Sequence, residues 1–449
     1  MPQNSTALPI PTAQSIISLP YAQRQQAIAA LPANQQADVT AQVAGMQRQM
    51  NQDYMRRSLV LQAVCPPSSG SGTTQNYSAG QDLIFNFPTA GGAFVRALLI
   101  KLNLTVVTAA GTGATYAANA GIPYSLIDRI RVNYNGTQHN FRPIFLKYWE
   151  KMRGFGRDRS GVVLSGSSVT DVQNLIEANI PAPAAVVAAG SANYIFTMRV
   201  PLNMHDLDPR GLLPSMGAGT QGQVEVICAP QALGPDPILN TIAATGGTGN
   251  AVTVTGTVEV DVEYSDGSNL QSQNPLQLSL AGLPTVQMLE DEVLSPLTAG
   301  TVNNHKVATL LQHVAVVSIL VDGQQSGKFS TIGNIQALAL AKDAVLSNRF
   351  FGFGAQYGNI AVSNFFERLR RRYGQDLSDD GVIVWVDALT DNVIDPDTRE
   401  GVNVLNMTSN GWTDVHHGYQ VGAVGAVATI TPRVVTHVFA INPAGLGIS

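Results

Sequence analysis

Two glycine-rich stretches are the first candidates for chemistry, because closely spaced glycines can hold phosphate groups against the backbone. Residues 217–222 (GAGTQG) match GxGxxG, the pattern of a dinucleotide site. That site needs a strand before the motif and a helix after it, whereas here a strand pattern, QVEVIC, follows. Residues 323–328 (GQQSGK) are one residue short of a phosphate-binding loop, and Phe329 replaces the required Ser or Thr. We interpret both stretches as turns.

The histidines and cysteines are the candidate metal ligands. Of the seven histidines only His416 and His417 are close in sequence, and adjacent residues of a strand point to opposite faces. We therefore expect no shared metal ion there. The two cysteines, Cys65 and Cys228, belong to no CxxC pair, which disfavours a thiolate zinc site and a disulfide framework. We expect reduced thiols, as in a protein that folds in a cytoplasm.

Two clusters of charge complete the candidates. Residues 395–400 (DPDTRE) lack the glycine and the spacing of an EF-hand loop, so we favour a solvated turn over weak cation binding. The densest basic run is Arg368 with residues 370–372. We expect these arginines to pair with carboxylates, such as Asp376, or with a neighbouring subunit, and a nucleic-acid patch is the alternative. No local pattern assembles a catalytic site, so we predict no catalytic residue, no cofactor and no metal.

The overall charge also argues against a dedicated nucleic-acid protein. The chain has 26 basic and 31 acidic residues, a net charge of −5, so it has no basic excess to neutralise phosphates. Only 13% of its 449 residues are charged, about half the usual fraction. Hydrophobic residues make up 45%, enough for large cores and against global disorder. A neutral, polar surface suits a protein that packs against copies of itself.

The first 65 residues or so predict a helical arm, because they are rich in Gln and Ala and nearly free of Gly. Pro20 and Pro32 stand near the starts of two helical segments. In the second, helical spacing puts five apolar residues on one face, and three arginines add positive charge towards the helix end, where the helix dipole favours it. This candidate assembly site consists of Val39, Val43, Met46, Arg48, Met50, Tyr54, Arg56 and Arg57. Either the helix packs on its own protein, or it contacts a neighbouring subunit or a membrane surface.

The rest of the chain predicts strands. Patterns typical of strands cover 82–87, 95–107, 127–134, 194–200, 223–228, 252–264, 312–321, 335–340, 381–386, 422–431 and 433–441. Asn135-Gly136 predicts a hairpin. One helix interrupts each β-rich half, at 141–155 and at 364–374, and both end in basic residues before a glycine. We expect neither a signal peptide nor a membrane span.

This order of elements predicts four segments. They are an N-terminal helical arm (1–70), a first β domain (71–270), a second β domain (271–440) and a C-terminal tail (441–449), with a linker near 266–275. The shared plan of strands, one aromatic and basic helix, then more strands suggests a tandem duplication.

The plan resembles the double jelly-roll major capsid proteins, above all those of the tectivirus group of membrane-containing bacteriophages. The stretches that resemble the family are the arm (22–50), FVRALLIKLNLTVV (94–107), residues 125–141, the unit FFERLRRRYGQDLSDDGVIVWVD (365–387) and residues 425–442. The Gly/Ala/Thr-rich insertion near 230–256 departs from the family, and we interpret it as a surface loop. The resemblance implies an all-β fold of two tandem eight-stranded jelly rolls, each with an inserted helix, behind the arm.

The same resemblance implies the function. The chain would be a capsid protein whose pseudo-hexameric homotrimers tile an icosahedral shell over an internal membrane. Its partners would be copies of itself, minor capsid and vertex proteins and that membrane, without sequence-specific binding of nucleic acid. It would be made in the bacterial host cytoplasm and reside in the virion. The alternatives are a phage fibre or spike component, a β-sandwich hydrolase acting on polysaccharide, which needs a carboxylate pair, and a sugar-binding module.

Overall fold

The computed structural model describes the helical segment, most of the first half of the chain and the strands of the second half. The described residues are 12–17, 19, 21–88, 93–109, 115–118, 122–134, 137–144, 146–147, 190–202, 212–214, 222–231, 233, 242–247, 249–266, 285–294, 297–298, 302–307, 312–322, 335–341, 349–353, 364, 367, 371, 382–386, 405–406, 415–421, 429–430 and 432–442.

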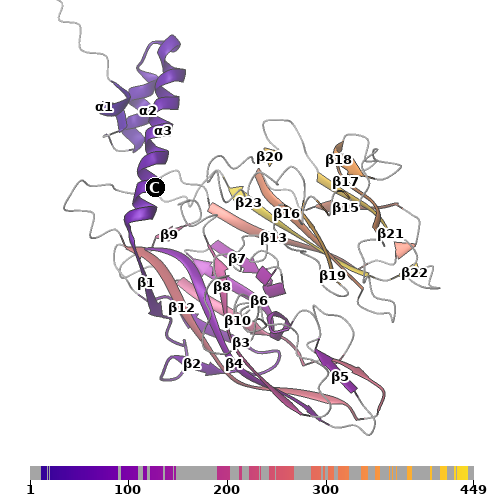
Figure 1. Ribbon diagram of the computed structural model, residues 1–449. Coiled ribbons are helices and arrows are strands. Elements are labelled where there is room, and N and C mark those ends of the chain that lie inside the picture. The colour runs from indigo at the N-terminus through magenta and orange to yellow at the C-terminus, as the bar shows by residue number, and fades with distance from the viewer. Residues whose placement is uncertain are drawn as a thin grey trace, which may run out of the picture.

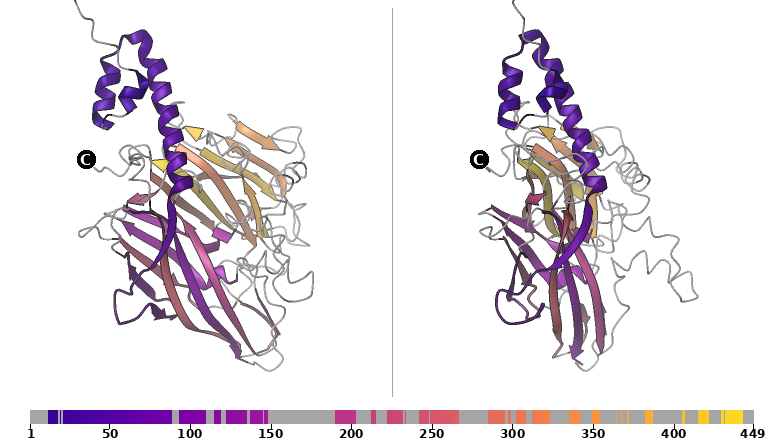
Figure 2. Two further views of the ribbon diagram at one scale, coloured as in Figure 1. Left: turned by 60° about the vertical axis from the view of Figure 1, so that its left-hand side comes forward. Right: turned by 90° about the vertical axis from the view of Figure 1, so that its left-hand side faces the viewer.

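The predicted arm is helical and projects from one end of the β structure (Figures 1 and 2). It contains α1 (Ala13–Ile17), α2 (Tyr21–Ala29) and α3 (Ala33–Arg57). Val43 is buried in a cluster with Ala13, Ile16 and Leu31, and Val39 and Met46 pack against it. The first half of α3 therefore has the predicted apolar face. Residues of α1 and α2 of the same chain cover this face.

The first β domain consists of two facing sheets. One has the order β1 (Leu59–Val64), β12 (Ala251–Asp266), β4 (Ala93–Ala109), β8 (Ser191–Pro201). The other has the order β3 (Asp82–Asn86), β10 (Gly222–Cys228), β6 (Ile127–Tyr134), β7 (Thr137–Phe141). Shorter elements add to them: β2 (Thr74–Asn76), β5 (Thr115–Ala118), the 3-10 turn η1 (Tyr124–Leu126), β9 (Leu213–Pro214) and β11 (Ile242–Thr245).

The second β domain repeats this arrangement. One sheet has the order β13 (Thr285–Leu294), β23 (Pro432–Asn442), β16 (Gln312–Asp322), β19 (Val382–Val386). The other has the order β15 (Val302–Val307), β21 (Val415–Val421), β17 (Ile335–Ala341), β18 (Arg349–Phe353). The short strands are β14 (Leu297–Thr298), β20 (Leu405–Asn406) and β22 (Thr429–Ile430).

The connectivity of both domains is that of a jelly roll. If the eight principal strands of each domain are numbered along the chain, one sheet has the order 1-8-3-6 and the other 2-7-4-5, in both domains and with antiparallel pairing throughout. Two such sheets, filled by the side chains between them, form a jelly-roll sandwich. The chain is therefore a double jelly roll, as the resemblance implied.

Alternating side chains build the core of the first jelly roll. The inner face of the β12–β4–β8 sheet and the facing sheet contribute Leu98, Ile100, Leu102, Phe196, Met198, Val258, Val260, Phe85, Ile130, Val132, Val224 and Val226, all buried. Tyr124 of η1 closes one side, with its ring 4.9 Å from that of Phe196 in an edge-to-face contact. The predicted hairpin at 135–136 joins β6 to β7, whose register pairs Tyr134 with Thr137.

Several predictions need correction or refinement. The stretch 230–256, interpreted as a surface loop, contains β11, which pairs with β5, and the start of β12, whose Val252 and Val254 are buried. Of the predicted strand at 422–431, the structure describes only residues 429–430, which form β22; β21, which ends at Val421, supplies the pairing with β17. Within the range predicted as arm, β1 pairs with β12 and belongs to the first jelly roll.

Parts of the two inserted helices are described. Residues 143, 144, 146 and 147 are helical after β7, and so are 364, 367 and 371 in the second domain, where Arg371 pairs with Glu367 one turn away. The remaining residues of both helices, most of the 266–275 linker and the stretches 217–221, 323–328 and 395–400 lie outside the described residues.

Candidate interaction surfaces

The outer face of the β1–β12–β4–β8 sheet carries a band of paired charges. Lys101 Nζ lies 2.7 Å from Glu259 Oε1 and 2.6 Å from Asp261 Oδ2. Burial alone would lower the pKa of Lys101, but the hydrogen bonds to Asp261 and Glu259 outweigh it and raise that pKa. The hydrogen bond from Lys101 lowers the pKa of Glu259, against the opposing effect of burial.

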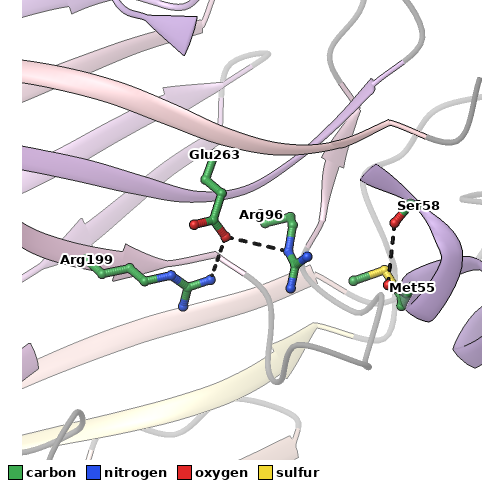
Figure 3. A network of polar contacts seen from close by, with 5 residues as sticks. All are labelled: Met55, Ser58, Arg96, Arg199 and Glu263. Atoms are coloured by element: carbon green, nitrogen blue, oxygen red, sulfur yellow. Dashed lines mark hydrogen bonds and ion pairs between the residues drawn. The ribbon is translucent and has the colours of Figure 1, made fainter. Parts of the chain in front are cut away.

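Nearer the arm, two arginines share one carboxylate (Figure 3). Glu263 Oε1 lies 3.0 Å from Arg199 Nη2 and 3.7 Å from Arg96 Nε, and the side chains are 14%, 16% and 7% exposed, respectively. The end of α3, with Met55 and Ser58, lies beside this group. With Lys101, Glu259 and Asp261 included, the band contains three cations and three carboxylates on adjacent strands. These charges cancel, so the band has no net charge.

Beyond this band the same face is uncharged. Register places three rows side by side on β12, β4 and β8: Thr257–Asn103–Ile195, Thr255–Thr105–Asn193 and Thr253–Val107–Ser191. Ile195 is 81% exposed and Val107 is 40% exposed. On the edge strand β1, exposed Val60 and Val64 lie beside the charged band, where register pairs them with Ser265 and Asp261. A flat, neutral face with exposed aliphatic side chains can bury area against another protein without leaving charge unpaired.

The candidate assembly residues of the arm divide between packing and solvent. Tyr54 is buried with Met55 and Leu212, and its ring meets that of Phe94 edge-on at 5.9 Å. This contact anchors the end of α3 to the first jelly roll. Arg56 and Arg57 are exposed at the last turn. Arg48 and Met50 lie in α3, but their side chains are outside the described part of the chain.

A small pocket of about 130 Å³ lies beside η1. Its lining consists of Tyr124, Ser125, Ile127, Asp128, Arg142, Ile144, Ala229 and Pro230. The volume corresponds to about four water molecules and is far below that of a cofactor site.

The other chemical candidates are separated by the fold. His416 and His417 are successive residues of β21, and successive residues of a strand alternate between its two faces. Among the described residues, no group of three or more His, Cys, Asp or Glu side chains could hold a metal ion. Cys65 and Cys228 are free and buried, and burial raises their pKa values to about 12 and about 11. No helix in the described part of the chain is long and apolar enough to cross a membrane.

The sequence indicated half of the charged band. The alternation of residues 258–264 predicted a strand with acidic residues on one face, and β12 has that form. Their partners, Lys101, Arg96 and Arg199, come from β4 and β8, which lie roughly 60 to 170 residues earlier in the chain, as counted from these positions. No local pattern connects residues so far apart; only the register of the sheet does.

Solved structures share this fold, although no protein-family model and no curated protein matches the chain. The STIV MCP aligns with 87% of this chain and 100% of its own length, with a TM-score of 0.53 and 12% identity. A chain of the atomic structure of Sulfolobus Turreted Icosahedral Virus aligns with 85% of this chain and 90% of its own, again with a TM-score of 0.53 and 12% identity. Both likenesses agree with the strand orders in assigning the double jelly-roll fold.

Proposed function

We propose that the chain is a major capsid protein, the repeated structural subunit of an icosahedral virus shell. The observation that carries this proposal is the tandem repeat of one jelly-roll topology, which aligns end to end with the STIV MCP. Three copies of a two-barrel chain present six similar units, and a six-sided outline tiles a hexagonal net. The role is structural: complementary surfaces, rather than a reaction, perform it.

The neutral face described above supports this proposal. A shell subunit must bury area against its neighbours, and buried unpaired charge costs several kcal/mol. The charged groups of the sheet neutralise one another within the chain, and the rest of the face offers Thr, Asn, Val and Ile. The same proposal has further parts. We place the chain in the virion, with minor capsid and vertex proteins and an internal membrane as partners. We also propose a bacteriophage source and synthesis in the bacterial cytoplasm.

The oligomeric state tests the proposal directly. For a homotrimer, light scattering coupled to size-exclusion chromatography should give three times 47.5 kDa, about 143 kDa. Negative-stain images should show compact particles of six-sided outline. Elongated trimers would favour a fibre or spike component instead. A protein that stays monomeric at all concentrations would contradict the capsid proposal.

The arm has a more specific proposed role, in contacts between assembled units. Its apolar face is covered by α1 and α2, so we assign these contacts to its exposed side, including Arg56 and Arg57. Deleting residues 1–47 keeps the anchor at Tyr54 and Met55. We expect this truncated chain to form trimers of normal stability and to assemble poorly into shells, as measured by light scattering and electron microscopy. Normal assembly of the truncated chain would show that residues 1–47 have no such role.

A further inference from the structure

The outer face of the second sheet of the first jelly roll carries a row of carboxamide side chains. The strands β3, β10, β6 and β7 lie side by side in that order (Figure 1). Register places one amide residue of each strand at the same level: Asn86, Gln223, Asn133 and Gln138. Gln223 and Gln138 are exposed, and the other two are half-buried. Gln223 Nε2 donates a hydrogen bond to Asn86 Oδ1 at 3.2 Å. We call these four residues the amide row.

The next level of the same face carries an ion pair on its two central strands. Register aligns Ile84, Glu225, Arg131 and Asn140 at this level. Arg131 Nη1 of β6 lies 3.1 Å from Glu225 Oε2 of β10, and the two side chains are 33% and 16% exposed. The positive and the negative charge cancel. They also give this face a direction, with the anion on β10 and the cation on β6.

The amide row can pair with a second copy of itself. Consider a twofold axis that runs parallel to the strands, between β10 and β6. It lays the face of one copy on the face of another with the order of the strands reversed. Gln223 of each copy then faces Asn133 of the other, and Asn86 faces Gln138. Because a carboxamide both donates and accepts, each facing pair can form hydrogen bonds.

The same axis also pairs opposite charges. Glu225 of each copy faces Arg131 of the other, so the two ion pairs combine into a square of alternating charges. At the outer strands Ile84 faces Asn140, and no charge is opposed there. A twofold axis at right angles to the strands would instead bring Glu225 against Glu225 at this level. Since twisted sheets align best near the centre of their contact, the central strands β10 and β6 matter most.

We propose that the outer face of the β3–β10–β6–β7 sheet binds the same face of a second copy of the chain about this twofold axis. The four strands are only about 14 Å across, so the patch is much smaller than the roughly 800 Å² per partner of a stable dimer. The contact is therefore weak by itself and gains strength where several copies are already held together. In this respect the inference rests on the proposed function, which supplies many linked copies.

Charge variants of the two central amides test the contact. The basic variant is Gln223→Lys with Asn133→Lys, and the acidic variant is Gln223→Glu with Asn133→Asp. Each variant alone places like charges face to face, so its association constant should fall at least about tenfold. An equimolar mixture of the two should regain association, because unlike charges then meet. Sedimentation velocity over a range of concentrations measures the association. Both variants should keep the parent melting temperature, since neither position belongs to the core.

Disulfide formation tests the geometry independently of charge. Full-length chains carrying Gln223→Cys are mixed with chains carrying Asn133→Cys under mild oxidation. The mixture should give linked pairs faster than either variant alone, because the axis sets position 223 opposite position 133. The native Cys65 and Cys228 are buried and do not compete.

Several results would overturn the contact. They are unchanged association of both charge variants, a mixture of them that stays unassociated, or equal disulfide yields in the mixed and unmixed samples. A parent trimer that never associates further would also overturn it, and would leave the capsid proposal standing. A monomer that pairs through this face would do the reverse.

Discussion

Replacing Gly256 with alanine should destabilise the first jelly roll by at least about 3 kcal/mol, because the substitution adds backbone strain and a steric clash. Gly256 lies within β12 with φ of +135°, a conformation that residues with a Cβ rarely adopt. A Cβ there would overlap the carbonyl oxygen of Asn103 and lie 2.9 Å from the Cα of Leu104, both backbone atoms of the paired strand β4. Neither atom can move aside without breaking the ladder.

Chemical denaturation of the purified variant measures this effect, and a low soluble yield would be its first sign. Gly45→Ala provides the matched control. Gly45 is exposed in α3, and a Cβ there would meet nothing within 4 Å. Because alanine is the better helix former, we expect a gain of up to about 1 kcal/mol. A Gly256→Ala protein with the denaturation midpoint of the parent chain would contradict the assigned backbone.

Replacing Glu263 with glutamine should cost about 3 to 5 kcal/mol, the usual loss when one member of a buried ionic group is removed. The carboxylate is shared by Arg96 and Arg199, and all three side chains are largely buried. Glutamine keeps the size of the side chain but not its charge, so the two guanidinium groups lose the anion between them. The midpoint of urea denaturation measures the loss.

The exposed pair of Glu367 and Arg371 is the control for this experiment. Its side chains are 46% and 78% exposed, so Glu367→Gln should change stability by less than about 0.5 kcal/mol. A further variant, Arg199→Met combined with Glu263→Gln, should recover part of the loss, because one cation then matches the lost anion. Equal stability of the Glu263→Gln and Glu367→Gln proteins would mean that the Glu263 group contributes nothing.

The strands of the first jelly roll could be predicted because local patterns determine them. The alternation in residues 127–134 and 223–228 matches β6 and β10, since inward residues such as Ile130 and Val226 must be apolar to fill the sandwich. The hairpin at Asn135-Gly136 could also be predicted, because this dipeptide favours a hairpin turn by itself. The prediction of a surface loop at 230–256 was wrong. Its Gly, Ala and Thr residues are typical of loops, but pairing with β5 and β4 makes part of the stretch into strands.

The candidate surfaces were harder to predict than the fold. Helical spacing identified the face of Val39, Val43 and Met46, but spacing cannot say what covers such a face, and here α1 and α2 cover it. Only the acidic half of the charged band on the β12–β4–β8 sheet could be predicted, because its pairing with basic residues depends on register between strands far apart in the chain. The burial of Arg142 and Lys147 likewise results from tertiary packing, which a local pattern does not report.

The length of α3 and its anchor at Tyr54 and Met55 have a mechanical consequence. The helix has 25 residues and is therefore about 37 Å long, held to the barrel at its end by Tyr54 and Met55. A tilt of about 10° at this pivot displaces the distal tip, with α1 and α2, by about 6 Å along its arc. Identical chains could thus place their tips at different heights above identical barrels. If the chain assembles into a shell as proposed, such tolerance would let one gene product occupy non-equivalent positions on a curved lattice without any change in its packed cores.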